Sequence, residues 1–402
     1  MTDEGATPAP EAVDEDGSRR PAAERPLHDE RTAAWLGLAL GVAFTVCFAT
    51  GVWSHLQQDP PSWFSAPARP AGLYRITQGV HVTTGYASIP LLLAKIWVVH
   101  PRLFDWPPAR SVLHAVERLA LLPLVGGGAF LLLSGVANVA RWYPWSFFFP
   151  RAHFWAAWVT MGGLVVHVGA KAATTREALR RRPAPTRTAA ATAPPAGATV
   201  PGPAADRRGF LAGVAAASGA LVVATAGGTV APLGAVSVLA QRRPGHGPQG
   251  LPVNKSAASA GVTATARDPA YRLVVDGAAG RRLALDLDDL RALPQREARL
   301  PIACVEGWSQ SATWRGVPLR DLLALADVPL DGAVVTVESL QAGGRYRASE
   351  VAGAQLRDRD TLLALELGGE PLHIDHGFPV RLVGPNRPGV LQTKWVARLE
   401  VR

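Results

Sequence analysis

The chain begins with a polar segment and then alternates long apolar stretches with short polar connections. Four apolar stretches lie at about 33–54, 73–99, 112–137 and 148–171. Each exceeds the roughly 20 residues that a helix needs to cross a hydrocarbon core of about 30 Å. Residues 31–172 therefore predict an all-α transmembrane bundle of four spans. Residues 1–30 are rich in Pro, Ala, Glu, Asp and Arg without an apolar period, which predicts a disordered tail.

The pattern changes twice after the fourth span. Residues 173–205 are a Pro/Ala/Thr/Arg stretch with no apolar face, which predicts a linker. Residues 206–240 open with a pair of arginines and continue as an apolar run of small residues, which predicts a fifth transmembrane helix. Residues 241–402 then mix strand and helix patterns and predict a separate α+β domain. The expected strands are 271–277, 334–338, 380–383 and 396–401, and the expected short helices are 287–292, 318–326 and 349–356.

Composition supports a membrane location. Hydrophobic residues make up 48% of the chain and charged residues 18%, which is apolar for a soluble protein. The net charge of +9 comes partly from Arg176, Arg180, Arg181, Arg182 and Arg187, beside the fourth span. Positive charge at a span end favours a cytoplasmic location over nucleic-acid binding. The N-terminus and this arginine cluster are thus expected inside the cell, and the domain beyond residue 240 outside.

Four histidines lie within the predicted spans: His81, His114, His153 and His167. Ionisable side chains are costly in a membrane, and two facing imidazoles can hold a haem iron. His153 and His167 are fourteen residues apart, so they share one helix face about 21 Å apart along the axis. Counting along the helices pairs His81 with His153 near the outer surface and His114 with His167 near the inner one. An ordinary interfacial role is the alternative for His153 and for His100.

The chain has only two cysteines, Cys47 and Cys304, which excludes a disulfide framework. Cys304 follows an apolar run that predicts a buried strand, and it precedes a Gly-Trp-Ser turn. A lone thiol in that position is either a small buried apolar group or a ligand or nucleophile. Zinc is disfavoured, because it requires three or four such ligands.

The motifs around Cys304 resemble the sulfite-oxidase-fold molybdopterin enzymes, nearest to their bacterial methionine-sulfoxide-reductase-like branch. They are Cys304-Val305-Glu306-Gly307-Trp308-Ser309, Trp314-Arg315-Gly316-Val317-Pro318-Leu319, His376-Gly377-Phe378-Pro379-Val380-Arg381 and Lys394-Trp395. The resemblance covers about residues 250–402. It implies that Cys304 is the catalytic molybdenum ligand. It also implies a set of residues that contact the pterin: Asn254, Ser339, His376, Arg381, Gln392, Thr393 and Lys394.

The chain departs from the family pattern at two places. His376 stands where the reductase-like branch commonly has Asn. Val305-Glu306-Gly307 follows the cysteine where eukaryotic sulfite oxidases carry an arginine pair, so sulfite is disfavoured as substrate. Taken singly, Arg381 and Lys394 could also be ordinary surface charges of strands.

The segment Arg207-Arg208-Gly209-Phe210-Leu211 resembles a twin-arginine export signal placed inside the chain. Such a signal implies that the twin-arginine machinery exports the folded domain, while the general secretion machinery inserts the earlier spans. The alternative is that the two arginines only set the orientation of the fifth helix.

These observations together predict a multi-pass oxidoreductase of a bacterial plasma membrane. Its molybdenum centre would reduce a small S-oxide or N-oxide substrate, with electrons from membrane quinol through two b-type haems. The first alternative is an enzyme that oxidises its substrate and delivers electrons to the quinone pool. The second is a non-catalytic membrane protein that keeps the pterin fold, which the presence of Cys304 disfavours.

Overall fold

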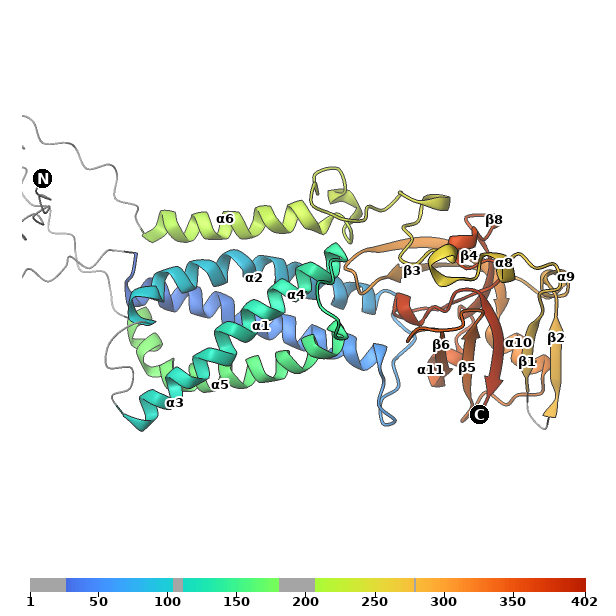
Figure 1. The fold of residues 1–402 in the computed structure, drawn as a ribbon, viewed down its shortest axis with the longest axis horizontal. Helices are drawn as coiled ribbons and strands as arrows, with labels where there is room; N and C mark the ends of the chain where they lie inside the picture. Colours follow the sequence, from blue (N-terminus) through green and yellow to red (C-terminus); the bar gives the residue numbers. More distant parts are fainter. Residues whose placement is uncertain (1–26, 104–110, 181–206, 278–279) are drawn as a thin grey trace, which may run out of the picture.

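The computed structural model describes residues 27–103, 111–180, 207–277 and 280–402. Long helices form the N-terminal part, and an α+β domain sits at one end of them (Figure 1). This is the multi-domain architecture that the sequence predicted. Most of the predicted tail, the greater part of the predicted linker, and the cluster members Arg181, Arg182 and Arg187 lie outside the described residues.

The helices of the N-terminal part have the length and apolar character of membrane spans. They are α1 (Glu30–Gln58), α2 (Leu73–Leu103), α3 (Val112–Leu121), η1 (Leu122–Gly126), α4 (Gly127–Ala140), α5 (Phe149–Arg180) and α6 (Arg207–Ala226). Among the described residues, five stretches can cross a membrane, since α3, η1 and α4 form one continuous stretch. Large apolar side chains such as Trp35, Leu93 and Trp155 point outward, as is typical of side chains that face lipid.

Three helix boundaries differ from the predicted segments. The third span contains a π-helical turn, η1, where Pro123 lacks the N–H that would continue the α-helical ladder. The fourth continues as α5 to Arg180, into the predicted linker. The fifth ends at Ala226, well before residue 240, because the chain turns back at Gly227, whose N–H donates to Ser237 Oγ at 2.7 Å.

The C-terminal domain contains two five-stranded sheets. In the first sheet the order is β2 (Arg282–Leu285), β1 (Leu273–Asp276), β10 (Val396–Val401), β5 (Val334–Ser339) and β6 (Ala348–Ala352). The second has β3 (Arg296–Ala303), β4 (Ser309–Pro318), β7 (Leu362–Leu367) and β8 (Glu370–Pro371), with β9 (Arg381–Val383) also paired to β7. Except for the parallel pair β1–β10, the strands are antiparallel.

Short helices cover these sheets and connect their strands. They are α7 (Ala257–Ala260), α8 (Thr263–Ala266), α9 (Leu287–Ala292), α10 (Leu319–Leu325) and α11 (Gly353–Arg357), with 3₁₀ turns η2 (Ala231–Leu233), η3 (Pro248–Gly250), η5 (Ile374–His376) and η6 (Gly389–Leu391). The main core joins α10 and α11 to both sheets through side chains such as Leu322, Leu356 and Val335. The predicted helix at 349–356 was wrong in its first half. That half is strand β6, whose alternation buries Val351 against β5.

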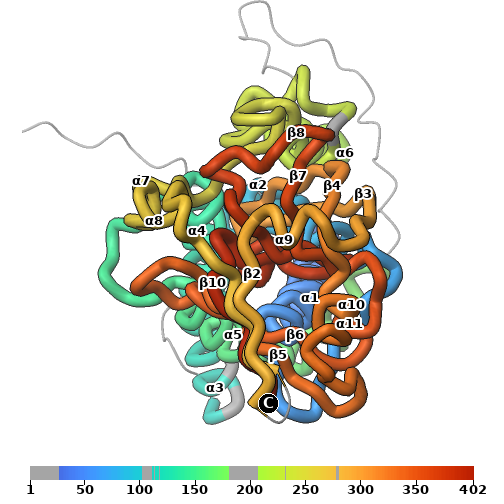
Figure 2. Tube along the Cα trace, turned by 90° about the vertical axis from the view of Figure 1, so that its right-hand side faces the viewer, coloured from blue at the N-terminus to red at the C-terminus, as the bar shows by residue number. Residues whose placement is uncertain are grey.

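Specific polar contacts join the domain to the helical part. Asn386 accepts a hydrogen bond from Tyr74 N at 2.6 Å, and its amide donates to Pro67 O at 2.6 Å. Arg69 forms ion pairs with Asp358, at 2.9 Å, and with Asp360. Viewed from the domain end, the strands lie in front of the helices (Figure 2). These contacts place the β3–β4 hairpin at the end of the bundle.

Candidate functional site

Cys304 lies at the tip of the β3–β4 hairpin. The two strands pair as far as Ala303 and Ser309, and Cys304 N donates to Trp308 O at 2.8 Å to close the loop. Gly307 has φ +83°, a left-handed conformation that favours glycine. The predicted sequence of buried strand, cysteine and turn is confirmed, and only 2% of Cys304 is exposed.

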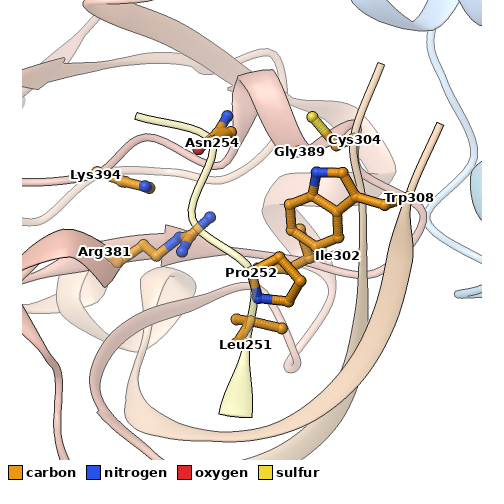
Figure 3. A pocket seen from close by; sticks show the side chains of 9 residues that line it. All are labelled: Leu251, Pro252, Asn254, Ile302, Cys304, Trp308, Arg381, Gly389 and Lys394. Carbon is orange, nitrogen blue, oxygen red and sulfur yellow. The ribbon is translucent and has the colours of Figure 1, made fainter. Parts of the chain in front are cut away.

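Cys304 faces a narrow crevice of about 10 Å³. Figure 3 shows Arg381 and Lys394 entering from one side, Cys304 and Trp308 on the other, and Asn254 on a third segment. The remaining lining residues are Leu251, Pro252, Ile302 and Gly389. The fold thus brings four residues of the predicted site, Asn254, Cys304, Arg381 and Lys394, into one place from four separate segments.

The two cations of the crevice are deeply buried. Arg381 Nη1 donates to His376 O at 3.1 Å, and Lys394 Nζ donates to Lys255 O at 2.9 Å and to Asp375 O at 2.7 Å. Neither forms an ion pair within the part of the chain that the structure describes. Burial lowers the pKa of Arg381 to about 9 and lowers the pKa of Lys394 well below its usual range. Because an unpaired buried charge is costly, the crevice favours an anionic ligand.

Several polar atoms around Cys304 are buried without a hydrogen-bond partner. Within the described residues they include Trp308 Nε1 and Arg381 Nε, which belong to lining residues, Ser309 Oγ, next to Trp308 in the chain, and Gln392 Oε1, two residues before Lys394. Native proteins leave few such groups unsatisfied. The residues present therefore fit a pterin with its phosphate, a ligand that is rich in donors and acceptors and carries negative charge.

The thiol of Cys304 is protonated in these surroundings. Burial, and then the carboxylate of Glu306, raise the pKa of this thiol to about 12. A thiol with so high a pKa is a poor nucleophile at neutral pH. A bound metal would release the proton, because a coordinating thiol is deprotonated.

Two of the predicted site residues, Ser339 and His376, contact residues that line the crevice. Ser339 Oγ donates to Lys394 O at 2.8 Å and so supports the strand segment that carries this lysine. His376 is 1% exposed, and its Nε2 lies 2.7 Å from Pro248 O. Burial lowers the pKa of His376 to about 4, so the ring is neutral and donates to that carbonyl. Neither residue lines the crevice, and both hold residues that do.

Gln392 and Thr393 are buried beside an arginine that the sequence analysis missed. Gln392 Nε2 donates to Arg387 O at 2.9 Å, and Thr393 Oγ1 lies 2.7 Å from Ser349 Oγ. Arg387 is 6% exposed and donates to Leu391 O at 2.8 Å and to Glu350 O at 2.7 Å. Its only signal in the sequence is a charge in a Pro-rich loop, which is usually a surface feature.

Trp308 and Gly389 are two of the five crevice residues that the sequence analysis did not assign. A Cβ on Gly389 would lie 2.9 Å from Ala303 O, so only glycine allows this loop to approach β3. No local pattern around Gly389 distinguishes it from any other loop glycine. Trp308 stands inside the cysteine motif itself, and its indole N–H is one of the unpartnered donors.

A second candidate site lies in the helical bundle. His81 of α2 and His153 of α5 have ring centroids 6.2 Å apart and planes inclined by 69°. Both line a cavity of about 200 Å³ between α1, α2, α4 and α5. Two imidazoles that bind one metal from opposite sides, through bonds of about 2 Å, place their ring centroids roughly 6 to 6.5 Å apart. The structure thus brings this predicted pair into a T-shaped ring contact, at a separation that ordinary aromatic packing also gives.

Hydrogen bonds orient both rings of this pair. His81 Nδ1 lies 2.8 Å from Cys47 O, and His153 Nδ1 lies 3.1 Å from Ser134 Oγ. A metal-binding histidine usually makes such a bond through its other nitrogen, which leaves Nε2 for the metal. Gly51 lies directly against His81, because a Cβ at this glycine would be 2.9 Å from the ring Cε1. The arrangement fits a group bound between the two imidazoles.

The predicted inner pair, His114 and His167, does not line this cavity. His114 lies in α3 and His167 in α5, both half-buried, and neither lines the 200 Å³ cavity. Their pairing stays a prediction, as does the interfacial role of His100 near the end of α2.

Comparison with known proteins identifies the C-terminal domain. Residues 260–402 match the family described as the oxidoreductase molybdopterin binding domain. Mitochondrial sulfite oxidase of Mus musculus is 37% identical over 157 residues, covering 33% of this chain and 29% of that protein. The putative protein-methionine-sulfoxide reductase subunit YedZ1 of Azospira oryzae is 34% identical over 131 residues, covering 33% of this chain and 48% of that protein.

Among solved structures, sulfane dehydrogenase SoxCD from Paracoccus pantotrophus is 28% identical, with a TM-score of 0.31, covering 33% of this chain and 38% of that chain. The chain spans about a third of the length of the sulfite oxidases it matches. The match and the geometry at Cys304 concern the same part of the chain. Residues 260–402 are an oxidoreductase molybdopterin-binding domain, carried here on a bundle of long apolar helices.

Proposed function

We propose that the chain is a membrane-anchored molybdopterin-dependent oxidoreductase whose molybdenum is bound by Cys304. The crevice carries this proposal: among the residues that the structure describes, two buried cations without carboxylate partners and two unpartnered N–H donors surround a single buried thiol. The bound molybdenum centre would supply two-electron oxygen-atom transfer. Arg381, Lys394 and Asn254 would hold the pterin.

The remaining residues of the predicted set have supporting parts in this proposal. Ser339 and His376 fix the backbone of Lys394 and the guanidinium of Arg381. Gln392 and Thr393 would present backbone and the free Gln392 Oε1 to the cofactor.

Reduction of an S-oxide or N-oxide substrate is the favoured direction. A bacterial relative is named as a putative protein-methionine-sulfoxide reductase subunit, and this chain joins a similar domain to its own helical bundle. The alternative is a substrate-oxidising enzyme that feeds the quinone pool, which the similarity to sulfite oxidases supports. The loop after Cys304 argues against sulfite itself, because it lacks the arginine pair that helps to hold an anionic substrate in the eukaryotic sulfite oxidases.

The bundle would carry electrons between a membrane quinol and the domain. A b-type haem between His81 and His153 would supply one-electron transfer, and His114 with His167 would hold a second. The 6.2 Å separation and the two oriented imidazoles support the outer haem. The proposal includes a bacterial plasma membrane as the location, with the domain outside and the arginine pair at Arg207 used for twin-arginine export.

The first test is the metal content of the detergent-purified full chain, measured by elemental mass spectrometry. We expect about one molybdenum and two irons per chain, with molybdenum lost in Cys304→Ser. Iron without molybdenum would reject the proposed site at Cys304. Molybdenum without iron would reject the haem bundle and require a separate electron donor.

The direction of electron flow needs a second test. We expect that methionine sulfoxide or trimethylamine N-oxide reoxidises the dithionite-reduced haem absorption bands. Reduction of the oxidised bands by sulfite would instead support the substrate-oxidising alternative.

A further inference from the structure

The loop 304–308 faces the helical part of the molecule. Asn138 of α4 donates from Nδ2 to Val305 O at 2.9 Å. Thr229, just after α6, donates from Oγ1 to Gly307 O at 2.6 Å, and Ser309 N donates to Gly228 O at 2.8 Å. Two carbonyls of the hairpin tip therefore find their donors outside the domain that contains the hairpin.

The side chain of Glu306 also connects this loop to the helical part, through Arg141. It forms ion pairs with Arg141, just after α4, at 3.5 Å and with Arg242 at 3.0 Å. At Gly307, a Cβ would approach Val82 of α2 and Val139 of α4 to between 3.3 and 3.4 Å. A larger residue at this position would push the loop away from the helices.

Val305 is part of the wall of the bundle cavity that contains His81 and His153. Cys304, its neighbour in the chain, is part of the wall of the crevice. One peptide unit therefore separates the linings of the two candidate cofactor sites.

We infer that the helical bundle contributes to the Cys304 site by positioning the loop that carries this cysteine. Asn138 and Thr229 are positioning residues that hold the loop 304–308 by its carbonyls, and Cys304–Val305 forms a common wall between the crevice and the bundle cavity. The inference rests on the proposed function in one respect, that both spaces hold cofactors. It assigns to Val305-Glu306-Gly307 the task of docking to the bundle.

Hydrogen exchange of the full-length protein in detergent tests the positioning role. The amides of Cys304, Gly307 and Ser309 are hydrogen-bonded in the docked loop, so loss of its anchors raises their exchange rates. In Asn138→Leu combined with Thr229→Val we expect at least about tenfold faster exchange in a peptide that covers 304–309, since two hydrogen bonds are lost and each is worth about fivefold. Exchange in β5, within the main core, should stay unchanged.

Matched variants separate anchoring from general destabilisation. Thr229→Ser keeps the hydroxyl donor and should exchange like the native chain, whereas Thr229→Val alone should raise the rate in 304–309. Tyr143→Phe removes the hydrogen bond to Asn138 Oδ1 and keeps the bond from Asn138 Nδ2 to Val305 O, so it should also exchange like the native chain. Rates in 304–309 within twofold of the native chain, in both the double variant and Thr229→Val, would overturn the inference.

The midpoint potential of the bundle's haem tests the common wall separately. Val305→Asp places a carboxylate at the bundle cavity and should shift the midpoint potential of the bundle's haem to lower values, while Val305→Leu should leave it in place. An unchanged potential in Val305→Asp would contradict the common wall. A purified chain without haem would reject the haem part of the proposed function, and the exchange experiment would still decide the positioning role.

Discussion

The crevice at Cys304 lies inside a packed α+β core and encloses about 10 Å³, whereas the cavity at His81 and His153 lies between helices and encloses about 200 Å³. The crevice is rich in charge and in unpartnered donors. The cavity is lined mainly by apolar side chains, with two hydrogen-bonded imidazoles in contact with each other in its wall. The two sites therefore select their ligands by different physical means.

The crevice selects by charge and hydrogen bonding. Buried Arg381 and Lys394 are costly until an anion arrives, so much of the binding free energy comes from relieving that cost. The cavity selects by shape and by metal ligation, because a flat apolar group loses little solvation between apolar helices and gains two metal–nitrogen bonds. A change at one site should leave the ligand of the other site in place, and this independence can be tested.

The largest effect should follow removal of the thiol. In Cys304→Ala we expect at least about a hundredfold loss of oxide reduction, equivalent to some 2.7 kcal/mol or more of transition-state stabilisation. Haem absorption should stay at its native level, because the imidazole pair is untouched. Loss of haem absorption together with activity would mean that the two sites do not assemble independently.

Removal of one imidazole should affect the haem and leave the molybdenum bound, the reverse of the result expected for Cys304→Ala. In His153→Ala we expect the haem absorption of the outer site to disappear while molybdenum stays bound, because a six-coordinate haem needs both axial ligands. His246→Ala, at an exposed histidine outside the helices, is the control and should retain full absorption. Unchanged absorption in both variants would exclude His153 as an iron ligand.

A smaller effect is expected when one cation of the crevice is neutralised. In Arg381→Gln the loss of charge-assisted hydrogen bonds should weaken cofactor retention by about tenfold to a hundredfold. The measurement is molybdenum content after extended dialysis. The free energy of unfolding of the cofactor-free protein should not fall, because the variant removes an unpaired buried charge. Lower stability without cofactor loss would make Arg381 a structural residue.

The smallest effect concerns the contact between Gly51 and His81. In Gly51→Ala the new methyl group would press on the imidazole, and overpacking of this kind costs about 1–3 kcal/mol. We expect a several-fold loss of haem occupancy in titrations with added haem. Gly41→Ala, in the same helix with open space around it, is the matched control and should bind like the native chain. Equal haem occupancy in Gly51→Ala and Gly41→Ala would show that the residues around Gly51 move to accommodate the added methyl group.

Local patterns in the sequence determined much of the molecule. A helix has a fixed rise per residue, so apolar length alone predicted five membrane-spanning stretches, and residue counting placed His81 level with His153. The strand, cysteine and turn around Cys304 also follow from adjacent residues. The motif resemblance selected Asn254, Arg381 and Lys394, which line the same crevice as Cys304.

Only the tertiary structure decided how the two parts meet. Nothing near Asn138, Thr229 or Asn386 in the sequence marks them as anchors, because their partners across the junction lie 78 to 319 residues away along the chain. The first half of the helix predicted at 349–356 is a strand for a similar reason. Its pairing with the distant strand β5 outweighs the local propensity for a helix. Short-range patterns follow from backbone geometry, which each residue carries with it. Contacts between distant segments depend on the packing of the whole chain, and they put the molybdenum-ligand candidate one residue from the bundle cavity.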